Sequence, residues 1–345
     1  MATLSEALRE GGAERLTLSA ARYRFDFRVT EPIDLPDYSG STIRGAFGGA
    51  LRRTACMTRM PDCKACPLYR SCPYTAVFET PPPESHELQK FTQIPNAYVI
   101  EPPRWGRHVC EAGERFSFRI VLIGRAREHL ALVIYAMQRA FSFHVAHGRA
   151  ELEGVSIERS SSLGDEELVY APGFARVAAH ENSTTLAIPR GDRATLRVET
   201  PLRLQNNGKA LRPGEIGAHA FMMALMRRVS LLSEFQMGEA LELDFRALSA
   251  AADGIGMRTD LVWKDWTRYS SRQERRMNFG GVVGAVELEG VPAPFLTLLS
   301  AGQMLHFGKN ATFGLGKYAL AGFLTAPAGA RGDSARSLLA RGCSR

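Results

Sequence analysis

Residues 303–318 read QMLHFGKNATFGLGKY and place three closely spaced glycines between a helix-like and a strand-like segment. The glycines are Gly308, Gly314 and Gly316, and Lys309 and Lys317 lie beside them. Glycine lets backbone N–H groups approach an anion without interference from a Cβ atom, and the lysines add positive charge. The Walker spacing is absent, and the glycines precede a strand rather than open a helix, so two nucleotide-binding motifs are excluded. Taken alone, the segment also fits a tight loop between a helix and a strand.

Outward from this loop, the pattern of apolar residues gives a similar order of elements in both halves of the chain. Apolar–polar alternation predicts strands, and apolar residues three or four apart predict helices. The order is read as β-α-β-β-α-β twice, with one strand-like segment more than the motif needs in the second half, which predicts an α+β protein of tandem ferredoxin-like domains. In the first half we predict strands at 18–29, 96–101, 114–123 and 150–157, and helices at 39–51 and 129–143. In the second half we predict strands at 194–204, 240–245, 259–269, 282–288 and 318–324, and helices at 215–235 and 294–305.

A length of 345 residues suits two domains. Their boundary falls in or after a polar stretch that begins at residue 160. We therefore divide the chain into an N-terminal extension (1–17), a first domain (18–165) with a cysteine-rich insertion (56–72), a second domain (190–325) with the glycine-rich loop (306–316), and a mobile tail (326–345).

The chain is basic, with a formal net charge of +7, and only six of its 43 basic residues are lysines. Arginine pairs bidentately with phosphate and stacks on bases, so this balance suits a nucleic-acid partner. A GC-rich genome would produce the same bias through its codons, and composition does not separate the two explanations. No apolar run approaches the ~20 residues that span a bilayer, and the N-terminus lacks a secretory signal. We expect a cytoplasmic protein with no membrane partner.

Four of the six cysteines lie within seventeen residues, at Cys56, Cys63, Cys66 and Cys72. Reduced thiols are the rule in the cytosol, so a disulfide framework is not expected. Four thiolates brought together by turns such as Cys63-x2-Cys66 predict a structural metal site, first of all for zinc. An iron–sulfur cluster or four free cysteines remain open alternatives.

The glycine-rich stretch resembles the glycine-rich loop of the RAMP superfamily of CRISPR proteins. His306-Phe307-Gly308, five residues that include Lys309, and Gly314-Leu315-Gly316 follow the superfamily pattern, with His306 where that pattern has its first glycine. Other stretches are similar to the branch that processes precursor CRISPR RNA, namely residues 39–47, 72–74, 200–204, 266–273 and 280–284. The resemblance implies two ferredoxin-like domains and metal-independent cleavage of repeat RNA. In that reaction the 2′-hydroxyl attacks the adjacent phosphate and leaves a 2′,3′-cyclic phosphate and a 5′-hydroxyl.

Such a reaction needs a base, an acid and cations at the phosphate. Several relatives place a catalytic histidine on the first helix, but residues 40–54 contain none. Our first candidate is His306 with Lys309 beside it, and Tyr38 stands at the entrance of the first helix. His306 could equally be a catalytically idle residue at a helix end, and His144 and His147 are the alternatives.

For RNA contacts we favour Arg268, Tyr269 and Arg272, because alternating arginine and aromatic side chains suit single-stranded RNA. A solvated strand face with an interior tyrosine is the competing interpretation. Arg44, Lys317 and the three glycines Gly308, Gly314 and Gly316 complete the candidate RNA-binding set.

Three hypotheses follow. The first is a metal-independent endoribonuclease that matures guide RNA from CRISPR repeats, with retention of the product left open. The second is a non-catalytic RAMP subunit that binds guide RNA beside other CRISPR effector subunits. The third is a zinc-stapled structural protein that is basic only through codon bias.

Overall fold

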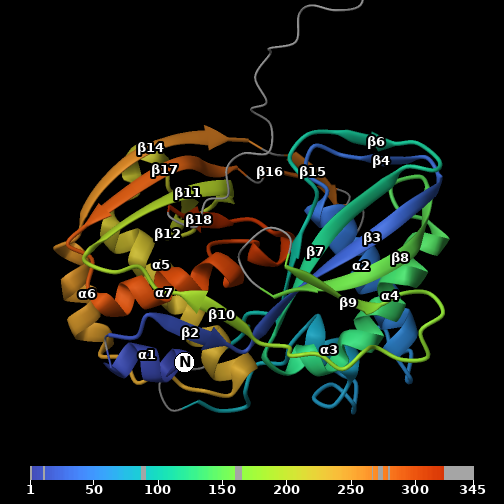
Figure 1. The fold of residues 1–345 in the computed structure, drawn as a ribbon, viewed down its shortest axis with the longest axis horizontal. Coiled ribbons are helices and arrows are strands. Elements are labelled where there is room, and N and C mark those ends of the chain that lie inside the picture. Colours follow the sequence, from blue (N-terminus) through green and yellow to red (C-terminus); the bar gives the residue numbers. More distant parts are fainter. Residues whose placement is uncertain are drawn as a thin grey trace, which may run out of the picture.

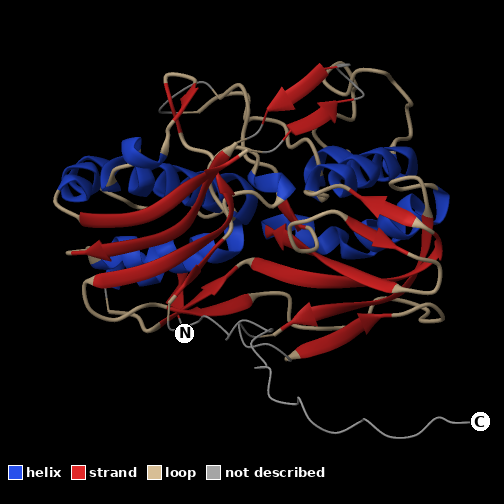
Figure 2. Cartoon of the chain, turned by 90° about the horizontal axis from the view of Figure 1, so that it is seen from above, coloured by secondary structure: helices blue, strands red, loops and turns tan. Residues whose placement is uncertain are grey.

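The computed structural model describes residues 2–10, 12–86, 91–159, 165–265, 267–270, 275–278 and 280–321. Two α+β units lie side by side in it, as Figure 1 and the view turned by 90° in Figure 2 both show. The predicted α+β class is confirmed. The predicted mobile tail lies outside the described residues.

The N-terminal unit is an antiparallel sheet with strand order β5-β7-β3-β8-β9. Strand β3 alternates, burying Tyr23, Phe25 and Phe27 while its arginines lie on the other face. Helices α2 and α4 bury their apolar residues in the same core as these aromatic residues. The elements are β3 (Ala20–Glu31), α2 (Gly40–Ala55), α3 (Pro73–Val77), β5 (Tyr98–Glu101), β7 (Arg115–Ile123), η1 (Gly124–His129), α4 (Leu130–Phe143), β8 (Arg149–Glu158) and β9 (Glu166–Tyr170).

The C-terminal unit is an antiparallel sheet with strand order β14-β17-β11-β18. If the four strands are numbered in chain order, their order across the sheet is 2-3-1-4. The first four strands of the N-terminal unit, β3, β5, β7 and β8, have the same order, and β9 is added at the edge. Its elements are β11 (Arg193–Leu202), η2 (Pro213–Glu215), α5 (Ala218–Leu232), η3 (Ser233–Met237), α6 (Phe245–Asp253), β14 (Gly256–Lys264), β17 (Gly281–Glu289), α7 (Ala293–Leu305), η4 (Ala311–Phe313) and β18 (Tyr318–Leu320).

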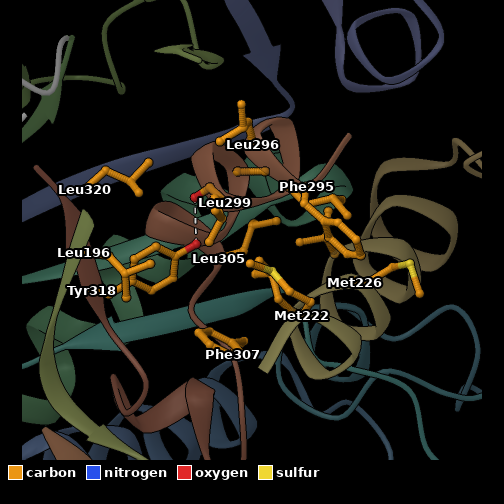
Figure 3. Packing of buried hydrophobic residues seen from close by; sticks show 14 of the residues in the cluster. Leu196, Met222, Met226, Phe295, Leu296, Leu299, Leu305, Phe307, Tyr318 and Leu320 are labelled. Atoms are coloured by element: carbon orange, nitrogen blue, oxygen red, sulfur yellow. Dashed lines mark hydrogen bonds between the residues drawn. The ribbon is translucent and has the colours of Figure 1, made fainter. Parts of the chain in front are cut away.

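The core of this unit lies between the sheet and helices α5 and α7 (Figure 3). Tyr318 of β18 points at α7 and donates a hydrogen bond of 2.6 Å from its hydroxyl to the carbonyl of Leu299. Phe307, at the start of the glycine-rich loop, packs edge-on against Tyr318 and against Phe221 of α5. The loop is therefore anchored in the core at its first residues.

The described residues also form one three-stranded and three two-stranded sheets outside the two main sheets. Their strands are β1 (Ala2–Thr3), β2 (Arg15–Leu18) and β10 (Thr184–Ala187) in one sheet, β4 (Ile33–Leu35) with β6 (His108–Cys110), β12 (Gln205–Asn206) with β13 (Lys209–Ala210), and β15 (Thr267–Ser270) with β16 (Arg275–Asn278).

The N-terminal residues do not stand apart as the predicted extension. Helix α1 (Leu4–Glu10) buries Leu4, Ala7 and Leu8 in the core of the C-terminal unit, and β2 pairs with β10. Helix α1 and strand β2 therefore pack with the C-terminal unit, although they precede the N-terminal unit in the sequence. No helix in the described part of the chain is long and apolar enough to cross a bilayer.

Two predicted strands were wrong. Residues 240–245 contain no strand, because α6 begins at Phe245 and Asp244 caps it by accepting from the backbone N–H groups of Arg246 and Ala247. The predicted strand 259–269 is interrupted, since β14 ends at Lys264 and β15 starts a separate hairpin at Thr267. At residues 240–245 a local hydrogen-bonding feature, the Asp244 cap, overrides the apolar pattern.

Candidate nucleic-acid interface and active site

The glycine-rich loop packs against the N-terminal unit. Gly314 has a φ of +86°, and a Cβ atom there would lie 2.3 Å from the carbonyl oxygen of Ile100 in β5. Gly316 has a φ of +70°, and its Cβ would lie 1.8 Å from the carbonyl oxygen of Phe307. Both positions therefore require glycine for backbone conformation and for close approach.

The same loop does not form the predicted phosphate cradle. The N–H of Gly314 donates to Ala311, that of Gly316 to Pro201 and that of Lys309 to Arg203, at 2.8, 3.2 and 3.0 Å. These amides are satisfied by protein carbonyls, so they are not available to an anion. Gly308, with a φ of +84°, lies against Leu202 and Arg203 and has the same packing role.

His306 is fully buried, so this structure does not present it to a substrate. Its Nε2 atom lies 3.1 Å from Oε1 of Glu101, and among the residues that the structure describes its Nδ1 atom has no hydrogen-bond partner. Its backbone has a φ of +50°, which fits the glycine of the RAMP pattern better than a histidine. Our prediction that His306 is the catalytic residue is therefore corrected to a role in joining the two units.

Glu101 is the centre of a buried ion cluster. Its carboxylate lies 3.0 Å from the guanidinium of Arg22 and 3.2 Å from Nζ of Lys317, besides the bond to His306. Burial opposes the charge, but Arg22 and Lys317 hold the pKa of Glu101 well below its usual range. Burial lowers the pKa of His306 despite the bond to Glu101, so its imidazole is neutral at neutral pH. Nε2 therefore carries the proton that it donates to the carboxylate.

Two other predicted site residues also hold the units together. The hydroxyl of buried Tyr38 donates to the carbonyl of Phe313 at 2.7 Å. Arg44 lies over the rings of Phe78 and Phe313, with its Cζ atom 4.4 and 5.1 Å from their centroids, and donates to the hydroxyl of Tyr98. Together with Lys317 they form contacts across the boundary rather than an RNA-facing surface.

Lys309 is exposed on the loop, as an RNA contact requires. Arg268 and Tyr269 lie on β15, opposite Met277 and Arg276 of β16. Arg272 lies outside the described residues. The hairpin thus places the basic strand β16 beside β15, the strand that carries the predicted RNA contacts Arg268 and Tyr269.

Two cation–aromatic pairs at the end of β14 were not predicted. Lys264 lies over the ring of Trp105, which belongs to the N-terminal unit, with 3.8 Å from Nζ to the ring centroid. Arg212, which is exposed, lies 3.9 Å over the ring of Trp263. The adjacent aromatic and basic residues Trp263 and Lys264 are a pattern in the sequence that could have indicated an RNA-binding site. Their partners Arg212 and Trp105 are distant in the sequence, and only the fold brings them close.

The open face of the N-terminal sheet is also rich in arginine, but its charge is neutralised. Arg24 is paired with Asp26 and Glu166, and both Arg28 and Arg115 with Glu153. Arg119 is paired with Glu158. This face therefore offers little net positive charge to a phosphate backbone.

The four clustered cysteines line one small cavity at the end of α2. The backbone N–H of Arg59 donates to Sγ of Cys56 at 3.2 Å, and Sγ of Cys66 lies 3.3 Å from the hydroxyl of Thr58. In the described part of the chain, however, no three His, Cys, Asp or Glu side chains already stand together as metal ligands. The fold gathers the predicted ligands Cys56, Cys63, Cys66 and Cys72 without preassembling a site, and zinc stays a prediction.

Residues 196–318 match the family described as CRISPR-associated endoribonuclease Cas6, and residues 18–182 match an N-terminal domain named AF_1859_N. The structure resembles that of Thermus thermophilus Cas6 in a product complex, with a TM-score of 0.53 and 13% identity over 87% of this chain and 99% of that one.

The C-terminal unit is thus similar to the Cas6 family, and the fold is similar to that of a solved Cas6. An uncharacterised protein of Archaeoglobus fulgidus is 24% identical to the chain over 293 residues, which cover 82% of this chain and 91% of the relative. A further structure, described as a RAMP protein binding different RNA substrates, has a TM-score of 0.44 and 10% identity, over 87% of this chain and 99% of that one. The predicted resemblance to the endoribonucleases that process precursor CRISPR RNA is confirmed over residues 196–318.

Proposed function

We propose that this Cas6-like protein binds CRISPR repeat RNA and cleaves it to mature guide RNAs. The observation that carries the proposal is the Cas6 match over residues 196–318, which end in the glycine-rich loop. Solved relatives described as Cas6 product and substrate-mimic complexes support an RNA substrate. The expected chemistry is the metal-independent attack of a 2′-hydroxyl, which leaves a 2′,3′-cyclic phosphate and a 5′-hydroxyl.

We place the RNA along the end of β14, the β15–β16 hairpin and the loop that carries Trp105. Lys264 and Arg212 rest on tryptophan rings there, and such side chains contact both phosphates and stacked bases. The hairpin adds Arg268, Arg275 and Arg276 by position. The open face of the N-terminal sheet also carries arginines, but they are paired with carboxylates. It therefore serves as the control surface that should not contact RNA.

Binding tests the placement. Lys264→Ala and Arg212→Ala should each weaken repeat-RNA binding at ~0.15 M salt and lower the slope of log K against log salt by about 1. Arg28→Ala, on the neutralised sheet, should leave both quantities unchanged. Equal losses in all three variants would place the RNA elsewhere.

Cleavage tests the activity. Wild-type protein should cut repeat RNA in EDTA, and a 2′-deoxy substitution at the cut site should stop the reaction, because the attacking hydroxyl is gone. Continued cleavage of the 2′-deoxy substrate would reject this chemistry.

A second candidate function is a non-catalytic RAMP subunit that binds guide RNA beside other CRISPR proteins. The burial of His306 and the lack of histidine in α2 favour it. It predicts tight repeat-RNA binding with no cleavage at any pH, which separates it from the first proposal.

A further inference from the structure

An open cavity lies in the N-terminal unit beside the start of α2, where the sequence carries no histidine. Its lining includes Asp34 of β4, Thr42 of α2, and Arg107 and His147 from two loops. His147 is exposed and belongs to the turn between α4 and β8, far from α2 in sequence. The fold therefore brings an imidazole to the helix start from another part of the chain.

The turn that holds His147 is strained. Val145 and Gly148 exchange two backbone hydrogen bonds of 2.9 and 3.1 Å, and the two residues between them, Ala146 and His147, have φ values of +50° and +70°. Two positive φ values are typical of a type I′ turn, which is usually occupied by Asn-Gly. The N–H of Asp34 donates to the carbonyl of Ala146 at 3.1 Å and fixes the turn beside β4. Strain of this kind concentrates at functional sites.

A second imidazole stands beside the first. His144, the exposed residue that follows α4, has its ring centroid 6.1 Å from that of His147, with the ring planes nearly perpendicular. Cleavage by a 2′-hydroxyl requires one group that accepts a proton and another that donates one. Two imidazoles at this separation can stand on opposite sides of one phosphate.

Arg107 supplies the positive charge. Its Nε atom donates to one oxygen of Asp34 at 2.7 Å, and its Nη2 atom contacts the other oxygen. This bidentate pair occupies two of the five guanidinium N–H groups and leaves three for phosphate oxygens. Asp34 thus orients Arg107 while the cation remains exposed.

The cavity adjoins the RNA surface proposed above. Arg107 and Trp105 lie two residues apart on one loop, and Trp105 carries the Lys264 contact. The N–H of Gly106 between them donates to the carbonyl of Asp37, which also lines the cavity, at 2.9 Å. RNA whose backbone contacts Lys264 at Trp105 would therefore place a neighbouring phosphate near Arg107.

We propose that His144 and His147 are the acid–base pair that cleaves the RNA, with Arg107 on the scissile phosphate; this rests on the proposed function. One imidazole accepts the proton of the 2′-hydroxyl as the O2′–P bond forms. The other, as imidazolium, gives its proton to O5′ as the P–O5′ bond breaks. No electrons are exchanged with a redox partner, and the two histidines end the step with their protonation states swapped.

Single-turnover cleavage of repeat RNA in EDTA tests the pair. His144→Ala and His147→Ala should each slow cleavage by at least about 100-fold while repeat-RNA binding stays within about twofold. His147→Asn is the second variant at that position, because asparagine tolerates the left-handed backbone and preserves the turn. His219→Ala is the control, since His219 is an exposed histidine on α5 of the other unit.

A substrate with sulfur in place of O5′ separates the two roles. A thiolate leaves without a proton, so this substrate should restore cleavage in the variant that lacks the acid and not in the one that lacks the base. Rescue of one histidine variant alone supports the pair. Wild-type rates in either alanine variant, or rescue of both or neither, would overturn it.

The wild-type reaction distinguishes the two proposals. If wild-type protein cuts the RNA but the histidine variants cut it equally well, only the acid–base assignment fails. If wild-type protein binds the RNA and never cuts it, the proposed cleavage itself fails.

Discussion

The Nε2 atom of His306 lies 3.1 Å from Oε1 of Glu101, so a hydrogen bond joins the C-terminal unit to the N-terminal unit where solvent does not reach. Glu101 also pairs with Arg22 of its own unit and with Lys317 of the other, so this carboxylate has one partner within its unit and two across the boundary. The relative position of the two units, on which any shared RNA surface depends, is therefore set partly by one buried charge.

Glu101→Gln should destabilise the protein by about 3–5 kcal/mol, because it leaves buried cations without their counter-charge. Urea unfolding measures the free energy. Glu153→Gln is the control, since Glu153 pairs with two more exposed arginines and should cost no more than about 1 kcal/mol. Similar losses in both variants would show that the buried cluster has no special role.

His306→Gly should be more stable than His306→Ala by about 1–2 kcal/mol, because a φ of +50° is strained for alanine and not for glycine. Thermal or urea unfolding of the two variants measures the difference. Neither variant should lower the rate of RNA cleavage in the folded protein by more than about threefold, since His306 does not reach the surface. A loss of about 100-fold with intact binding would restore His306 as a catalytic residue.

Acid should weaken the fold in two steps. The pKa of His306 is lowered by burial, so as the pH falls from about 7 to about 5 the unfolded chain takes up this proton first and stability decreases. The pKa of Glu101 lies well below its usual range, so its contribution is present above the ordinary value and is lost only at lower pH. Urea unfolding across this range should show a smaller upper step in His306→Gly than in wild type. Identical slopes between pH 7 and 5 would contradict the assignment.

Gly314→Ala should destabilise the contact between the units by several kcal/mol, because a Cβ atom would overlap the carbonyl of Ile100 at 2.3 Å. Gly173→Ala is the matched control, since Gly173 also has a positive φ, +97°, but open space around it. The control carries the backbone strain alone, so the difference in unfolding free energy isolates the close approach. Equal losses of unfolding free energy in the two variants would mean that the loop can move away from Ile100 without destabilising the protein.

The cysteine cluster predicts one zinc ion per chain. Metal analysis of the purified protein should find it, and Co²⁺ replacement should give thiolate charge-transfer absorption. Cys63→Ser and Cys66→Ser should abolish both signals, whereas Cys110→Ser, outside the cluster, should not. Because the sulfurs are not preassembled, binding has to draw them together. Metal-free protein that takes up no Co²⁺ would reject the site.

The candidate site shows where sequence reasoning reached its limit. We assigned His306 and Lys309 to one catalytic site because they are close in the sequence. In the structure His306 is buried and Lys309 is exposed. Glu101 gave no signal, because its three partners come from positions far apart in the chain. His147 was recognised as an alternative, but nothing in its neighbours in sequence placed it beside α2.

The order of helices and strands, the α+β class and the glycine pattern of the loop were determined by the amino-acid sequence, because periodicity and backbone freedom act over a few residues. The sequence also failed locally where one side chain changed the outcome, as Asp244 does when it caps α6. Burial, ion pairing and the meeting of His144, His147 and Arg107 were decided only by the tertiary structure. Solvent access and charge depend on which distant segments pack together, and local sequence does not specify that packing.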